Sequence, residues 1–180
     1  RCGGVFRLAD FDVLELSNMN RIRSGVHEIG ELKVVNTARE ILEIDPFLDV
    51  EIFSQGLHHD NMDAFFLRNG QLDLVIDECD SLDVKLLLRE YARQWRIPVL
   101  MDTSDRGMID IERFDLEPER PILHGLIAHL DPAAALKAVT QEEKLPFVVP
   151  IAGLATLSKR MKGSMLEIGH SVTTWPQLAT

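Results

Sequence analysis

Short apolar segments that end in acidic residues alternate with amphipathic segments through the first part of the chain. The apolar segments, which favour β-strands, cover residues 5–9, 50–53, 72–77 and 99–101. Apolar residues recur at helical spacing over residues 32–42, 60–67 and 82–95. Such alternation is typical of right-handed crossovers between parallel strands. The sequence therefore predicts an α/β fold with a mostly parallel sheet flanked by helices.

The pattern weakens in the last third of the chain. Residues 114–121 are charged and contain prolines, which predicts an irregular segment, and helices are expected over residues 132–139 and 151–161. A length of 180 residues is ordinary for one domain. We therefore expect a single domain. Because the chain does not begin with methionine, we also expect it to be part of a longer protein.

The chain carries 19 Lys and Arg residues against 29 Asp and Glu residues, for a net charge of −10. Nucleic acids and anionic membranes are bound by clustered Lys and Arg, so this balance argues against both as main partners. No apolar run approaches the roughly 18 residues of a membrane span. Neither Cys2 nor Cys79 belongs to a C-x-x-C pair, which argues against a disulfide framework and a cysteine-based zinc site. This cysteine usage fits a reducing compartment and predicts a cytoplasmic location.

Acidic residues stand at the ends of three predicted strands. They are Asp10 and Asp12, then Asp77 and Asp80, then Asp102 and Asp105. In an open parallel sheet, ligands bind beyond the carboxyl ends of the strands. A single Asp at such a position usually begins a turn or caps a helix. Three sets together favour a binding site at this edge of the sheet.

Two basic residues near the first acidic strand end could hold phosphate. Arg21 ends the amide-rich segment Ser17-Asn18-Met19-Asn20-Arg21, and its guanidinium has a fork that matches phosphate oxygens. Lys33 lies in the first turn of a predicted helix, where unpaired backbone N–H groups already favour an anion. Taken alone, each residue is equally compatible with a solvated surface position.

The order of these motifs strongly resembles the ThiF/MoeB/HesA family of ubiquitin-activating-type adenylyltransferases. The matching segments are Leu8–Asp12, Ser17–Arg21, Gly30–Lys33, Asp45-Pro46 and Val75–Ser81. The S-N-x-N-R segment beside D-x-D is the most specific of them, and the resemblance spans roughly residues 5–107. It implies a Rossmann-like fold of the ThiF/MoeB type, with the nucleotide-binding core in residues 1–107 and a substrate-side or interface region in residues 108–180.

The resemblance also implies a reaction and a role for each matching residue. A carboxylate would attack the α-phosphorus of ATP, giving an acyl-adenylate and pyrophosphate. Asp10 would accept hydrogen bonds from the ribose hydroxyls, and Asn18 would contact the phosphate region. Arg21 and Lys33 would hold the β and γ phosphates and stabilise the charge as pyrophosphate leaves. Asp80 would bind Mg²⁺.

The sequence departs from the family in three respects. Ile22 follows Arg21 where the family usually has Gln. The glycine-rich phosphate loop of the family lies upstream of the segment that resembles the start of this chain, so we expect a fragment that lacks the loop and is inactive alone. The last third has no cysteine, so neither thioester transfer nor zinc is expected. Cys79 is interpreted as a small buried residue rather than a nucleophile.

Several partners follow from the resemblance. The C-terminus of a ubiquitin-like or sulfur-carrier protein is the candidate acyl substrate, and relatives work as homodimers, which we expect of the parent protein. Similar domains are also fused to nitroreductase-like flavin modules, so a flavin-binding domain is a candidate neighbour.

Two other functions stay open. An NAD- or FAD-binding Rossmann domain of an oxidoreductase would use Asp10 equally well, but it needs no γ-phosphate clamp. A non-catalytic dimerisation or scaffold module would need neither the ribose contact of Asp10 nor a phosphate clamp.

Overall fold

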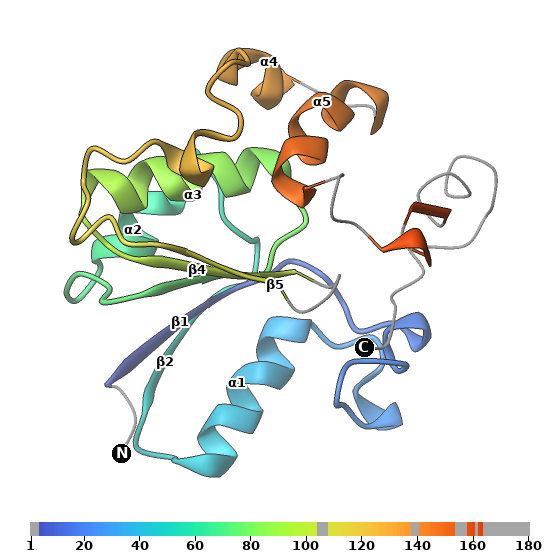
Figure 1. The fold of residues 1–180 in the computed structure, drawn as a ribbon. Helices are drawn as coiled ribbons and strands as arrows, with labels where there is room; N and C mark the ends of the chain where they lie inside the picture. Colours follow the sequence, from blue (N-terminus) through green and yellow to red (C-terminus); the bar gives the residue numbers. More distant parts are fainter. Residues whose placement is uncertain (1–3, 104–107, 138–140, 154–157, 161, 164–180) are drawn as a thin grey trace. The chain divides into compact units, whose positions relative to one another are not determined.

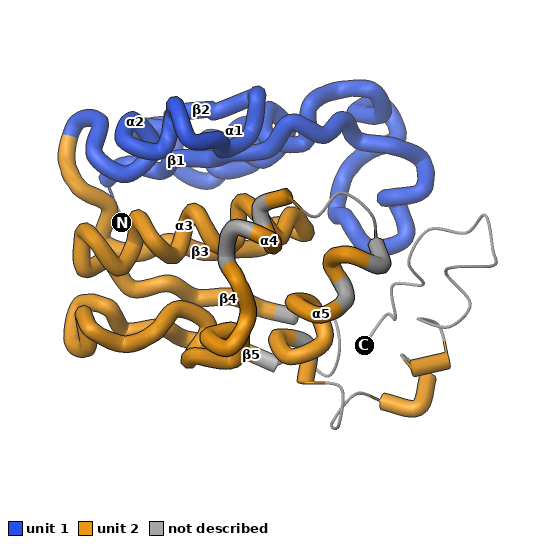
Figure 2. The backbone as a smooth tube through the Cα atoms, turned by 90° about the horizontal axis from the view of Figure 1, so that it is seen from above, with its two compact units in different colours: residues 1–69 blue, residues 70–180 orange. Residues whose placement is uncertain are grey.

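The computed structural model describes residues 4–103, 108–137, 141–153, 158–160, 162 and 163. The chain divides into two compact units, residues 1–69 and residues 70–180, which are coloured separately in Figure 2.

The first unit is built on two parallel strands. Strand β1 (Val5–Ala9) pairs with β2 (Asp49–Phe53) from Val5 opposite Asp49 to Ala9 opposite Phe53. Helix α1 (Lys33–Ile44) connects the two strands and contacts both of them (Figure 1). Helix α2 (Met62–Leu67) follows β2. The buried apolar residues of this unit are Leu14, Val34, Ala38, Met62, Phe65 and Phe66.

The long connection between β1 and α1 is held closed by backbone hydrogen bonds. Val13 forms an antiparallel bridge with Leu32, and the Leu14 N–H donates to the Glu31 carbonyl oxygen at 2.8 Å. Gly30 has a φ of +92°, a backbone conformation that side chains disfavour, and its N–H donates to the Leu14 carbonyl oxygen at 2.8 Å. The closure brings the strand end beside the first residue of α1.

The second unit contains a three-stranded sheet. Strand β3 (Val75–Asp77) runs parallel to β4 (Val99–Thr103), and β4 is antiparallel to β5 (Met108–Glu112). The helices are α3 (Leu82–Gln94), α4 (Pro132–Lys137) and α5 (Gln141–Ala152). Leu82 and Leu86 of α3 pack in a core with residues of the later segments, namely Leu123, Ile127, Ala135 and Phe147.

The structure confirms the predicted α/β class and corrects it in the last third. Strand β5 and most of α5 were not predicted. Of the helix expected over residues 151–161, residues 151–152 and 159–160 are helical, and residues 154–157 and 161 lie outside the described residues. The sequence pattern failed at α5 because Pro146 and Pro150, which normally interrupt a helix, lie inside it. Residues 114–121 form neither helix nor strand, as predicted.

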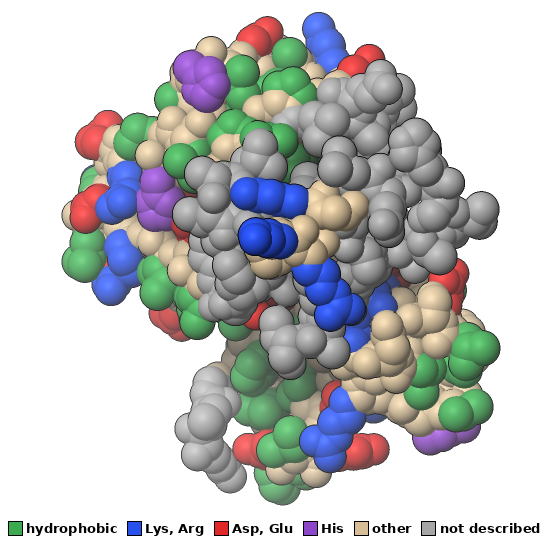
Figure 3. All heavy atoms as spheres, turned by 45° about the vertical axis from the view of Figure 1, so that its right-hand side comes forward, with side chains coloured by type: hydrophobic (Ala, Val, Ile, Leu, Met, Phe, Trp, Pro, Cys, Tyr) green, Lys and Arg blue, Asp and Glu red, His purple; other side chains and the backbone are tan. Residues whose placement is uncertain are grey.

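Several large hydrophobic side chains stay exposed, and Figure 3 shows such side chains in green among charged ones on one face of the molecule. In the first unit they include Phe11, Leu16 and Val26, which are 65%, 74% and 73% exposed. Scattered exposure of this kind is usual on protein surfaces, so it assigns no partner. Over the part of the chain that the structure describes, no helix combines the length and the apolar character that crossing a membrane requires.

Candidate nucleotide site

A pocket of about 330 Å³ lies in the first unit, beside the carboxyl end of β1. It is lined by Asp10, Leu14, Ile22, Arg23, Ser24, Lys33, Asn36, Thr37 and Glu40. Two of the predicted site residues, Asp10 and Lys33, therefore share one pocket. They reach it from different elements, Asp10 from the residue after β1 and Lys33 from the first position of α1.

An ion pair at this pocket is made by Asp12 rather than by Asp10. The Lys33 Nζ donates to Asp12 Oδ2 at 2.8 Å, and the two side chains are 21% and 51% exposed. Asp10 uses its Oδ1 to accept the Asp12 backbone N–H at 2.8 Å. Because the Lys33–Asp12 pair is partly in water, its attraction is weak. A bound anion could replace Asp12 as the partner of Lys33.

The predicted loop residues Asn18 and Arg21 do not line the pocket. Asn18 is 8% exposed, and its Oδ1 accepts the Glu15 N–H at 2.9 Å, which closes the 3-10 turn Leu16–Asn18. Arg21 is exposed and donates to the Ser17 carbonyl oxygen at 3.3 Å and to Asn20 Oδ1 at 3.0 Å. The loop therefore fixes its own shape.

Sequence reasoning missed the other polar residues that line the pocket, namely Arg23, Ser24, Asn36, Thr37 and Glu40. Arg23 lines the pocket two positions after Arg21, but the S-N-x-N-R segment ends at Arg21 and gave no signal for Arg23. Asn36 lines it from the second turn of α1. The spacing of Lys33, Asn36 and Glu40 places all three on one helical face, and this periodicity was the available signal.

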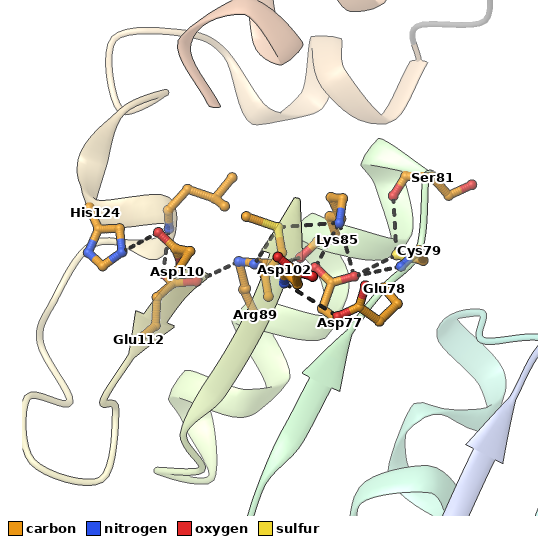
Figure 4. Close-up of polar contacts among 12 residues, drawn as sticks. Asp77, Glu78, Cys79, Ser81, Lys85, Arg89, Asp102, Asp110, Glu112 and His124 are labelled. Atoms are coloured by element: carbon orange, nitrogen blue, oxygen red, sulfur yellow. Dashed lines mark hydrogen bonds and ion pairs between the residues drawn. The ribbon is translucent and has the colours of Figure 1, made fainter. Parts of the chain in front are cut away.

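The second unit carries a buried charge network at the carboxyl end of β3 (Figure 4). Arg89 on α3 is 0% exposed, and its Nη1 donates to Asp77 Oδ2 at 2.5 Å while its Nε donates to Glu112 Oε2 at 2.5 Å. Lys85, one turn earlier on α3, donates to both Asp77 oxygens at 3.0 and 3.1 Å. Two cations and two carboxylates therefore compensate one another inside the unit.

Burial and these partners set the pKa values at the strand end. Burial alone would raise the pKa of the Asp77 carboxyl, but the nearby charges of Lys85 and Arg89 outweigh it and hold that pKa below its ordinary value. Burial, together with the charge of Asp77, raises the pKa of the Cys79 thiol to about 12. The Cys79 Sγ donates to Asp77 Oδ1 at 2.9 Å. The thiol is consequently protonated at neutral pH and is a poor nucleophile.

Asp80, the predicted metal ligand, is exposed. Within the described residues its carboxylate has no hydrogen-bond or ion-pair partner. No group of three or more His, Cys, Asp or Glu side chains in the described ranges could hold a metal ion. Asp80 belongs to the second unit, whereas Asp10 and Lys33 belong to the first. That the three residues form one nucleotide site therefore stays a prediction. Asp105 lies outside the described residues.

A second polar contact continues from the buried network along β5. The Leu123 N–H donates to Glu112 Oε1 at 2.6 Å, and the His124 Nε2 lies 2.7 Å from Asp110 Oδ2 (Figure 4). Leu123 and His124 have φ values of 49° and 53°, which side chains rarely adopt. Asp110 Oδ1 and His124 Nδ1 are buried and have no hydrogen-bond partner in the described part of the chain. The turn is thus held in an unusual backbone shape by its contacts with β5.

Comparisons with known proteins give one consistent family. The ThiF family matches residues 2–163. The chain is 48% identical over 176 residues to "Uncharacterized protein MT1398" of Mycobacterium tuberculosis, covering 98% of this chain and 24% of that protein. It is 28% identical over 95 residues to ubiquitin-like modifier-activating enzyme 5 of Caenorhabditis briggsae, covering 48% of this chain and 22% of that enzyme.

One solved structure adds a nucleotide to this comparison. The crystal structure of the Escherichia coli tRNA N6-threonylcarbamoyladenosine dehydratase TcdA in complex with ATP is 28% identical, with a TM-score of 0.51. The match covers 59% of this chain and 44% of that one. The chain therefore spans less than half the length of each of these relatives.

Proposed function

The chain belongs to the ThiF family, and we propose that the protein containing it activates a carboxylate by ATP-dependent adenylation. The carboxylate oxygen would form a bond to the α-phosphorus of ATP. The bond from that phosphorus to the bridging oxygen would break, and pyrophosphate would leave with the electron pair. The products would be an acyl-adenylate and pyrophosphate.

The observation that carries this proposal is the shared pocket of Asp10 and Lys33. A carboxylate that can accept from ribose hydroxyls and an ammonium that can hold phosphate line one cavity of about 330 Å³. The ammonium stands at the N-terminus of α1, where the helix dipole also favours an anion. The ATP complex of the TcdA relative supports a nucleotide as the ligand.

The remaining predicted residues have roles in this proposal that their surroundings allow. Arg21 is exposed and held only by local loop contacts, so its guanidinium could turn to the β and γ phosphates. Asn18 keeps its amide N–H donors, which have no hydrogen-bond partner among the described residues, for the phosphate region. Lys33 and Arg21 would stabilise the negative charge that develops on pyrophosphate.

Asp80 is the residue proposed to hold Mg²⁺, because its carboxylate is exposed and without a partner in the part of the chain described. Magnesium uses few protein carboxylates together with phosphate oxygens, and would supply positive charge to them. No protein nucleophile is needed for adenylation. The protonated Cys79 thiol is consistent with a reaction that uses none.

The acyl substrate and the assembly are finer proposals. The name of the worm relative speaks of a ubiquitin-like modifier, which supports the C-terminus of such a protein or of a sulfur carrier as the substrate. The homodimer, the fused flavin domain and the cytoplasmic location stay predictions from the sequence.

The test is carboxylate-dependent ATP–pyrophosphate exchange, measured on the protein in its full natural length. Arg21→Ala and Asp80→Ala should each abolish exchange. Arg39→Ala, an exposed position on α1 outside the pocket, and Asp83→Ala, three residues after Asp80, should leave it intact. Tight NAD binding without exchange would instead support an oxidoreductase domain. Binding of neither nucleotide would support a scaffold.

A further inference from the structure

Asn36 is a buried amide without a hydrogen-bond partner among the residues that the structure describes. Its side chain is in the second turn of α1, and the residue is 4% exposed. Within the described residues, neither its Oδ1 nor its Nδ2 donates or accepts a hydrogen bond. Burying an amide without a partner is costly, and nearly all buried polar groups in proteins are satisfied. An apolar residue of similar size would fill this position at no such cost, so packing alone does not account for an Asn here.

The position of Asn36 relates this amide to the proposed nucleotide site. It lines the same pocket as Asp10 and Lys33, on the helical face that Lys33 begins. The opposite face of α1 packs in the core through Val34 and Ala38, which are 2% and 5% exposed. Asn36 is thus a polar residue on the pocket face of α1 whose hydrogen-bonding groups are unsatisfied among the described residues.

Resting on the proposed function, we infer that Asn36 contacts the base of the bound nucleotide and selects adenine. Asp10 takes the ribose hydroxyls in that proposal, and Lys33 takes phosphates at the N-terminus of α1. Asn36 lies one turn further along the helix, away from the end that attracts anions. Of the parts of ATP, the base is the one left for it.

The chemistry of a carboxamide suits that assignment. Asn presents a donor beside an acceptor, and the N7 edge of adenine presents the complementary pair, the 6-amino donor beside the N7 acceptor. At that edge a 6-oxo purine presents two acceptors, O6 and N7, to a carboxamide that burial fixes in orientation. The 6-oxo base would then leave one hydrogen-bonding group unsatisfied.

The first experiment measures nucleotide binding by calorimetry on the protein in its full natural length. Wild-type protein should bind ATP roughly ten-fold or more tightly than inosine triphosphate, the gain expected of a two-bond contact to a base. Asn36→Ala should lose that preference by weakening ATP binding while leaving inosine triphosphate binding unchanged. The ratio of ATP to 2′-deoxy-ATP affinity should be the same in both proteins, because that ratio reports the sugar.

The second measurement separates this role from a structural one. Without nucleotide, Asn36→Ala should keep or raise the melting temperature, because it removes an unsatisfied buried amide. Asn61→Ala is the matched control. Asn61 donates to the Gly56 carbonyl oxygen at 2.8 Å and accepts the His58 N–H at 2.9 Å, so its removal should lower the melting temperature and leave base preference intact.

Three outcomes would overturn the inference. An unchanged ratio of ATP to inosine triphosphate affinity in Asn36→Ala would overturn the base contact alone, with the proposed function standing. A change only in the ratio for 2′-deoxy-ATP would assign Asn36 to the sugar instead. Absence of any nucleotide binding or exchange in wild type would overturn the proposed function and this inference together.

Discussion

The charged strand ends of the two units differ in how completely their side chains are paired. In the second unit, Asp77, Arg89 and Glu112 are each at most 2% exposed and satisfy one another at 2.5 Å. In the first unit, Lys33 has a half-exposed partner and Asn36 has none among the described residues. The sequence pattern treats both strand ends alike. Their pairing indicates that the second network stabilises the fold, whereas the first set keeps polar groups available for the nucleotide that we propose.

The sharpest way to break this contrast is to remove Arg89. Arg89→Met would leave Asp77 and Glu112 buried without their shared cation, and we expect a loss of about 3–5 kcal/mol in the free energy of unfolding. Urea denaturation measures this loss. Arg93→Met on the same helix breaks only the exposed pair with Glu90 and should cost less than about 1 kcal/mol. If the two variants lost equal amounts of unfolding free energy, the buried network would stabilise the fold no more than an exposed ion pair does.

Asp77→Asn should have the next largest effect and should depend on pH. At neutral pH we expect a loss of about 2–3 kcal/mol, the range for a hydrogen bond to a charged group. The pKa of Asp77 is lowered in the fold, so its contribution is complete above the ordinary value of 3.8 and is lost as pH falls below it.

Wild type and the Asp77→Asn variant should therefore converge in stability below about pH 3.8. Unfolding curves recorded between neutral and acidic pH check this. Glu112 gives the opposite pH dependence of stability. Burial raises the pKa of its carboxyl, so its contribution to the free energy of unfolding grows as pH falls. A constant difference between the two proteins down to strongly acidic pH would contradict the lowered pKa.

The first half of the fold could be predicted because local pattern and tertiary environment agree there. β1, α1, β2, α3 and β4 all lie within a few residues of the predicted segments. Asp45-Pro46 ends α1 and Ser81 precedes α3, both as the local signals indicate. These segments are defined by short-range spacing, which one sequence contains.

Strand β5 could not be predicted because its burial pattern is inverted. Ile109 and Ile111 are 62% and 52% exposed, whereas Glu112, on the other face of the strand, is 0% exposed. The usual expectation of apolar side chains inside fails where the buried face carries a carboxylate for Arg89. That partner is 23 residues away, and no local pattern reveals it.

The same limit applies to the site. Asp10 and Lys33 were predicted from strand-end and helix-start positions, and the structure places both on one pocket. The unpaired state of Asn36 depends on which groups surround it in three dimensions, so the sequence could show only its helical face.

Lys33→Ala tests the same contrast in the first unit, where the charged side chains are proposed to bind a ligand rather than to stabilise the fold. Its partner Asp12 is 51% exposed, so the free energy of unfolding should fall by less than about 1 kcal/mol. ATP–pyrophosphate exchange should fall by about a hundred-fold or more, as is usual when a transition-state cation is removed. A stability loss comparable to that of Arg89→Met, with exchange retained, would reverse the roles assigned to the two regions.

The smallest effect is expected at Cys79, and it tests how well the second network is closed. Burial and Asp77 raise the pKa of this thiol to about 12, so its thiolate is scarce at pH 8. In a Cys2→Ser background, iodoacetamide should label Cys79 slowly at pH 8, and Cys79→Ala should leave exchange unchanged. In the Arg89→Met variant the network is broken, and labelling should become faster as the region opens. Rapid labelling of Cys79 in the otherwise intact protein would show that the charges around Asp77 are accessible to water, and would remove the distinction between the two strand ends.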